Sequence, residues 1–162
     1  MDYQPTELGE VLRVKKIVTV HYFEYTKDFA FDGEAHDFWE FVYVDRGVID
    51  IRADERRYRL KQGEMTFHKP GEFHALYADG MVAPNLVIVS FYCRSRAVRF
   101  FSDRIFKING DQKEYLSTIV KEAGRAFDSP LSDPNLKLLS RRSGAVFGAE
   151  QMIKLSLEAL LI

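Results

Sequence analysis

The 162-residue sequence is short of several features, and each shortage excludes a class of protein. Its single cysteine, Cys93, cannot form an intramolecular disulfide, which excludes the disulfide framework of a small secreted domain. It has no secretory leader, and no apolar run is long enough to span a bilayer. We therefore expect a cytoplasmic domain with no membrane partner.

The chain also lacks a substantial net charge. The 23 Lys and Arg residues nearly balance the 24 Asp and Glu residues, and the net charge is -1. The chain therefore lacks the positive field with which a DNA-binding domain attracts phosphates. Hydrophobic residues, by contrast, make up 46% of the chain and aromatic residues 14%. This composition predicts one globular domain with a substantial core.

The first part of the chain has the pattern of an antiparallel β domain. Short runs rich in Val, Ile, Phe and Tyr alternate with turn signals such as Arg46-Gly47 and Pro70-Gly71. No helical pattern separates these runs, which favours a sandwich or a barrel. The predicted strands cover residues 14–25, 38–44, 48–53, 57–60, 64–68 and 85–93.

After Cys93 the hydrophobic period becomes helical. The stretch "SRAVRFFSDRIF" indicates a short helix or an irregular crossover, and longer helices are predicted at 110–127 and 147–162. A linker with two prolines, at residues 129–135, separates them. We place a barrel at residues 1–94 and a helical dimerisation segment, packed on that barrel, at 95–162.

The last predicted helix carries two apolar stripes. One stripe contains Met152, Leu155 and Ala159, and the other contains Ile153, Leu157, Leu160 and Leu161. The barrel covers one of them, and the second is either buried deeper in the same domain or covered by a second chain. We predict a homodimer and favour the stripe with Ile153 as its contact, because that spacing is the more continuous.

Histidines supply the candidate chemistry. The stretch "HKPGEFH" places His68 and His74 around a turn, and His36 precedes the predicted strand that holds Glu40. In a strand His36 and Glu40 share one face, while Trp39 lies on the opposite face toward the helical segment. An ideal strand separates His36 from Glu40 by roughly 13 Å, too far for one metal ion unless the segment bends. His68 is predicted at the rim, since it precedes a Lys-Pro pair.

The spacing of these residues resembles the two motifs of the cupin superfamily. The first is His36-x3-Glu40-x6-Gly47, and the second is Gly63-x6-Pro70-Gly71-x2-His74. The resemblance implies a mainly β fold, the jelly-roll barrel or double-stranded β-helix, in whose mouth the motif residues gather. Glu34 stands where the motif carries the first histidine of a His-x-His pair. Because this exchange alters the ligand set, we predict that no metal and no other cofactor is bound.

Essentially the whole chain, and above all "FGAEQMIKLSLEALLI", resembles the N-terminal domain of AraC-type transcription regulators. In that family a cupin barrel binds a small effector, a helical segment dimerises, and a further domain with two helix-turn-helix units binds DNA. The sequence contains no such unit, so contact with DNA is expected only through a missing C-terminal domain. The ending "LEALLI" has no helix-terminating signal, and we expect a longer protein to continue beyond Ile162.

The resemblance implies a small-molecule site in the barrel mouth. His36, Glu40 and His74 offer hydrogen-bond donors and acceptors for it. Arg46 resembles an arginine that contacts sugar in the arabinose-responsive member, which makes sugars candidate effectors. Tyr22 and Tyr77 are candidates for hydroxyl or stacking contacts.

These features predict a sensing and dimerising domain that is not an enzyme. The alternative is a small metal-dependent cupin enzyme, such as a dioxygenase or an isomerase. A dimerising barrel without any ligand is a third reading. His21 has no identifiable partner in the sequence and is expected to be structural.

Overall fold

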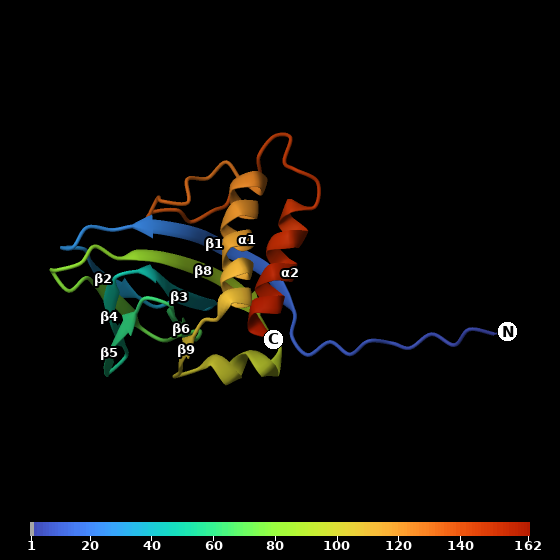
Figure 1. Cartoon of the computed structure of the whole chain (residues 1–162), viewed down its shortest axis with the longest axis horizontal. Helices are drawn as coiled ribbons and strands as arrows, with labels where there is room; N and C mark the ends of the chain where they lie inside the picture. The colour runs from blue at the N-terminus through green and yellow to red at the C-terminus, as the bar shows by residue number, and fades with distance from the viewer. Residues whose placement is uncertain (1) are drawn as a thin grey trace.

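The computed structural model describes residues 2–162 and places two antiparallel sheets beside two helices (Figure 1). The helical elements are the 3-10 helix η1 (Arg96–Phe101), α1 (Gly110–Ala126) and α2 (Ala149–Leu161). The strands are β1 (Val14–Glu24), β2 (Ala30–Glu34), β3 (Trp39–Arg46), β4 (Val48–Ala53), β5 (Arg56–Lys61), β6 (Glu64–His68), β7 (His74–Tyr77), β8 (Asn85–Cys93) and β9 (Ile105–Lys107).

The strand order interleaves distant parts of the chain. The five-stranded sheet has the order β1-β8-β3-β6-β9 and the four-stranded sheet the order β2-β7-β4-β5. A hydrophobic core joins the two sheets, with Val42 of β3, Ile51 of β4 and Leu76 of β7 among its buried members. The predicted mainly β fold with antiparallel sheets is thereby confirmed.

Strand β3 separates two hydrophobic cores. Val42 and Val44 belong to the core between the sheets, whereas Trp39, Phe41 and Tyr43 belong to a second core shared with both helices. This alternation follows from the two-residue period of a strand and was predicted for Trp39. Each large side chain that leaves water in this way stabilises the fold by about 1.5–3 kcal/mol.

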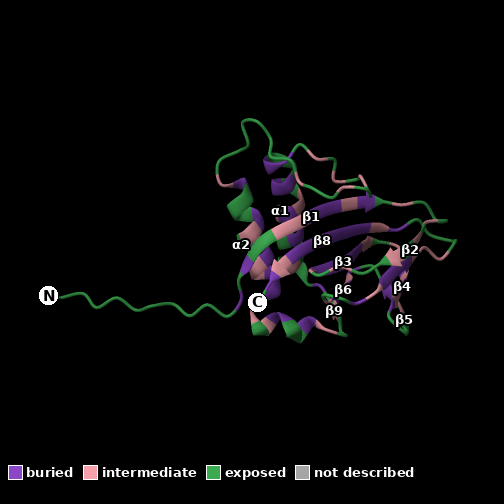
Figure 2. Cartoon of the chain, turned by 180° about the vertical axis from the view of Figure 1, so that it is seen from behind, coloured by how far each residue is buried: buried purple, intermediate pink, exposed green. Residues whose placement is uncertain are grey.

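The two helices pack on the outer face of the five-stranded sheet. Helix α1 begins with a capping box, in which the Asn109 side chain accepts from the Gln112 backbone N–H and the Gln112 side chain accepts from that of Asn109. Figure 2 shows both helices partly buried, and both contact β1, which is itself buried over only part of its length. Neither helix, over the described residues, is long and apolar enough to cross a membrane.

The face of α2 chosen for a partner needs correction. Ile153, Leu157, Leu160 and Leu161 are between 1% and 7% exposed, because the chain's own barrel and α1 cover them. Met152 and Leu155, on the other stripe, are 44% and 47% exposed. The buried stripe is therefore part of the domain core and is not free for a second chain.

The segment after Cys93 is not purely helical. Strand β9 pairs with β6, so the chain returns to the five-stranded sheet beyond the expected boundary at residue 94. A long linker, residues 127–148, then joins α1 to α2 and bonds to the edge of β1, where the Tyr22 N–H donates to the Leu131 carbonyl. At the other end of the chain, residues 2–11 are exposed and extend away from the body (Figure 1).

The corrected role of α2 is testable by unfolding. Leu157→Ala should lower the free energy of unfolding by about 2–5 kcal/mol, since it leaves a cavity in the core. Leu155→Ala, on the exposed stripe, should change it by less than about 0.5 kcal/mol in the monomer. Urea titration followed by fluorescence of Trp39, the single tryptophan, measures both. Equal losses in the two variants would contradict this packing.

Candidate functional site

Four acidic and histidine side chains converge inside the barrel. The ligand atoms of Glu34, His36, Glu40 and His74 all lie within 4.8 Å of one another. His36 Nε2 is 3.6 Å from Glu40 Oε2, and His74 Nε2 is 3.3 Å from Glu40 Oε1. The side chains of His36 and Glu40 are each 9% exposed, so the cluster is largely withdrawn from water.

A bend in the chain brings His36 to Glu40. Strand β2 ends at Glu34 and β3 begins only at Trp39, with a bend at residues 37–38 between them. The Gly71 N–H donates to the His36 carbonyl, and the His36 ring stacks on Phe38 with 3.8 Å between the centroids. The separation expected for a straight strand therefore does not apply, and the distance argument against a metal site was wrong.

The histidine rings are held so that one nitrogen of each faces inward. His36 Nδ1 donates to the Phe38 carbonyl at 3.0 Å, and His74 Nδ1 donates to the Glu72 carbonyl at 3.2 Å. A carbonyl only accepts, which assigns the proton to Nδ1 in both rings. Within residues 2–162, Nε2 of His36, of His68 and of His74 is buried without a hydrogen-bond partner.

Glu40 is the charge at the centre of the cluster. Burial disfavours its ionised form, but the nearby His74 imidazole outweighs burial and holds the pKa of Glu40 well below its ordinary range. Burial likewise opposes the charge on His74, yet the nearby Glu40 carboxylate raises the pKa of His74. Ser90 Oγ donates to Glu40 Oε2 at 2.8 Å. The cluster therefore contains an ionised carboxylate at neutral pH.

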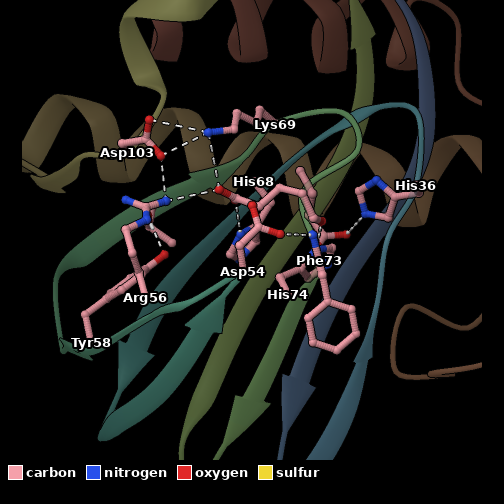
Figure 3. Close-up of polar contacts among 12 residues, drawn as sticks. His36, Asp54, Arg56, Tyr58, His68, Lys69, Phe73, His74 and Asp103 are labelled. Atoms are coloured by element: carbon pink, nitrogen blue, oxygen red, sulfur yellow. Dashed lines mark hydrogen bonds and ion pairs between the residues drawn. The ribbon is translucent and has the colours of Figure 1, made fainter.

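A second polar network, which contains His68, Glu72 and Arg56, contacts His74 (Figure 3). The His68 ring stacks on His74 with centroids 4.2 Å apart, and His68 Nδ1 donates to Glu72 Oε2 at 3.0 Å. Arg56 reaches Glu72 at 3.0 Å and also pairs with Asp103. Burial lowers the pKa of His68. His68 is fully buried, so its predicted place at the rim was wrong.

Glu34, His36 and Glu40 form the polar end of a pocket of about 440 Å³ in the barrel, and His74 contacts it only through Glu40. Its walls are mainly aromatic, and successive rings of His21, Phe23, Tyr25 and Phe29 stack on one another. The linker between the helices contributes Pro134, Leu136 and Lys137. A depression of about 680 Å³ between β1 and α2 is larger, but its lining contains no histidine. Three of the four converging side chains therefore line this pocket.

Three predicted contacts lie outside this pocket. The Tyr22 hydroxyl donates to Asp45 and faces α1. Tyr77 lies beside Asp50 and Arg59 on the outside of the four-stranded sheet. Arg46 is exposed, because the register of β3 against β8 shifts after Val44. His36, Glu40 and His74 are the predicted residues that the structure brings together.

Sequence reasoning missed other members of the site. His21 lines the pocket, its Nδ1 donates to the Leu131 carbonyl at 3.2 Å, and burial lowers its pKa. Because side chains alternate between the two faces of β1, His21 shares the face of Phe23 and Tyr22 lies on the opposite face. This alternation could have indicated His21 from the sequence. Glu72 supports two histidines, yet nothing in "PGEFH" distinguishes it from a turn residue.

The donor set fits the metal that cupin barrels imply. Imidazole nitrogens and carboxylates are ligands for Fe, Mn or Zn, and an Nδ1–H held by a carbonyl is the usual support of a ligating histidine. The orphaned Nε2 atoms of His36 and His74 meet both conditions, with Glu40 beside them. Glu34, which replaces the motif histidine, brings a fourth ligand atom into range.

The chain is similar to known proteins in sequence and in structure. The family model of the AraC-like ligand binding domain matches residues 16–142. Apo ToxT from Vibrio cholerae superposes with a TM-score of 0.53 and 10% identity, over 91% of this chain and 55% of that one. A cupin superfamily protein from Desulfitobacterium hafniense gives a TM-score of 0.44 and 13% identity, over 57% of this chain and 84% of that one. No curated protein sequence matches significantly.

The likeness to ToxT shows a shared fold over nearly the whole chain, and this chain spans about half of the ToxT length. The family model covers the barrel strands, the histidine cluster and α1. The match extends over well more than half of the 162 residues. The chain therefore belongs to the family of AraC-like ligand binding domains.

Proposed function

We propose that this chain is the effector-sensing and dimerising part of an AraC-type transcription regulator and is not itself an enzyme. One observation carries the proposal: a domain of a ligand-binding family holds a pocket of about 440 Å³ that ends on Glu34, His36 and Glu40. Pockets of this size with apolar walls and a few convergent polar groups are typical of small-molecule sites.

The polar end of the pocket supplies selectivity. A buried polar atom without a partner costs about 1–3 kcal/mol. His36 Nε2 is such an atom at the pocket, and a ligand that satisfies it gains over one that does not. Tyr22, Arg46 and Tyr77 lie outside the pocket and have no place in this contact.

The linker gives the pocket a connection to α2. Pro134, Leu136 and Lys137 line the pocket, and the same linker continues into the first turn of α2. Arg141 in the linker pairs with Glu150 in α2 at 2.8 Å. A ligand that contacts the linker therefore acts on a segment joined directly to α2, the helix that we propose forms the dimer contact.

Ligand binding is tested by thermal shift and calorimetry across monosaccharides, aromatic acids and amines. A compound that stabilises the wild type should bind His36→Ala at least about tenfold more weakly, because the variant removes one polar partner worth about 1.4 kcal/mol. Tyr77→Phe, outside the pocket, is the matched control and should bind normally. Unchanged affinity in His36→Ala would place the ligand elsewhere.

The exposed stripe of α2 is the proposed contact between two copies. Met152 and Leu155 are exposed on this helix, and Phe147 directly before it is also fully exposed. A two-fold axis lets such a surface cover itself, which is the commonest arrangement of soluble homo-oligomers. Removing the two α2 side chains from water contributes about 1.5–3 kcal/mol for each when burial is complete.

Leu155→Glu should convert the dimer to a monomer without unfolding it, because it places an unpaired charge in the contact. Light scattering at matched concentrations measures the association, and circular dichroism checks the fold. Thr26→Glu adds the same charge at an exposed position between β1 and β2, outside α2, and it should remain dimeric. A Leu155→Glu protein that stays dimeric would assign the contact to another surface.

A metal-dependent cupin enzyme is the second candidate, favoured by the converging donor atoms. His36, Glu40 and His74, with Glu34, would hold the ion, which would supply Lewis-acid chemistry. Under the first proposal, protein purified without an affinity tag contains no stoichiometric transition metal by elemental analysis. A content of about one equivalent that disappears in His74→Ala would instead support the enzyme.

A further inference from the structure

The polar end of the pocket presents hydrogen-bond acceptors. His36 Nδ1 donates to the Phe38 carbonyl, so in the neutral ring Nε2 carries a lone pair. That lone pair lies 3.6 Å from a Glu40 oxygen, which is an acceptor as well. Glu34 adds a second carboxylate within the same 4.8 Å cluster. Ser90 is a donor here, and its hydroxyl is already bonded to Glu40.

These acceptors need a donor or a positive charge from the occupant. Two of them, His36 Nε2 and the Glu40 carboxylate, are largely withdrawn from water, where facing acceptors are not stable without one. His36 shows where the donor is needed, because its side chain is 9% exposed, lines the pocket and has an Nε2 atom without a hydrogen-bond partner. The complementary group is a compact cation or a group rich in N–H.

The aromatic walls of the pocket determine which kind of molecule can carry this cationic or N–H group. Phe23, Tyr25 and Phe29 form a stacked series on one part of the lining, and Phe31 and Phe38 add further rings. Aromatic faces attract a cation and stack on flat apolar bodies. They offer few hydrogen bonds, so the hydroxyls around a sugar would lose their partners in water. Lys137, from the linker, is exposed and can keep its ammonium in solvent.

We propose that the effector is an organic amine, with an ammonium head at His36, Glu40 and Glu34 and an aromatic or apolar body between the phenylalanine and tyrosine rings. The inference rests on the proposed sensing function and names the chemical class of its ligand. A bare divalent metal satisfies the same acceptors but leaves the aromatic part of the pocket without a role.

Matched compounds test the head group. Benzylamine, 2-phenylethylamine and tryptamine are each compared by calorimetry with the alcohol and the carboxylate of the same carbon skeleton, at pH 7 on protein treated with EDTA. At least one amine should bind about tenfold or more tightly than both its partners, since it alone brings the charge that a buried carboxylate requires. Mn²⁺ and Zn²⁺ are titrated separately.

Variants test whether amine affinity depends on the carboxylates of the cluster. Glu34→Gln should weaken the amine about tenfold, and because Glu34 is exposed at the end of β2 the protein should stay folded. Glu24→Gln removes an exposed carboxylate of β1 that does not line the pocket, and it should bind amines normally. Glu40→Gln should abolish binding, with circular dichroism as the check on its fold.

Each other outcome overturns the inference in a distinguishable way. Tighter binding of alcohols, carboxylates or monosaccharides would reject the amine class while keeping the sensing function. Binding of Mn²⁺ or Zn²⁺ without any amine would reject both and favour the metal-dependent enzyme. Failure of every compound and metal would reject the pocket as a ligand site altogether.

Discussion

A carboxylate enclosed in the barrel determines much of the structure around it. Glu40 is 7% exposed, and an ionised group at that depth is tolerated only with partners. Its partners come from separate parts of the chain: Ser90 from β8, His74 from β7 and His36 from the bend before β3. The interleaved strand order is what makes these residues neighbours, and His74 in turn depends on His68 and Glu72 behind it.

The same arrangement explains why one site is compatible with either a metal ion or an organic cation. Histidines whose Nδ1 atoms are tied to carbonyls present lone pairs inward, and carboxylates beside them add further acceptors. A transition metal and an ammonium group both meet that demand. The walls of the pocket differ in what they favour, because stacked rings suit an organic body and contribute no ligand to an ion. An organic cation therefore uses more of the observed site than a metal does.

The helical part of the chain is coupled to this site by covalent continuity and by packing. The outward face of β3 supplies Trp39, Phe41 and Tyr43 to the core that holds both helices, while its inward face supplies Glu40 to the pocket. The linker touches the pocket on its way to α2. A change at the pocket thus has two physical routes to the exposed stripe of α2, one through a strand and one through the linker.

The sequence by itself determined those features that depend on local periodicity. The two-residue alternation placed Trp39 opposite Val42, and the helical period located α1 and α2, because each pattern is a property of a few consecutive residues. The resemblance of the His36, Glu40 and His74 stretches to the cupin motifs implied that these residues share a site.

Only the tertiary structure decided the features that depend on what packs against what. The bend at residues 37–38 brings His36 to Glu40, and it is held by Gly71, which is distant in the sequence. The short strands β7 and β9 are each paired with a longer neighbour, β4 and β6, that is distant in the sequence. Both stripes on α2 are apolar in the sequence, and packing against the barrel and α1 decides which one is buried. Burial is a property of the assembled fold, which local patterns do not contain.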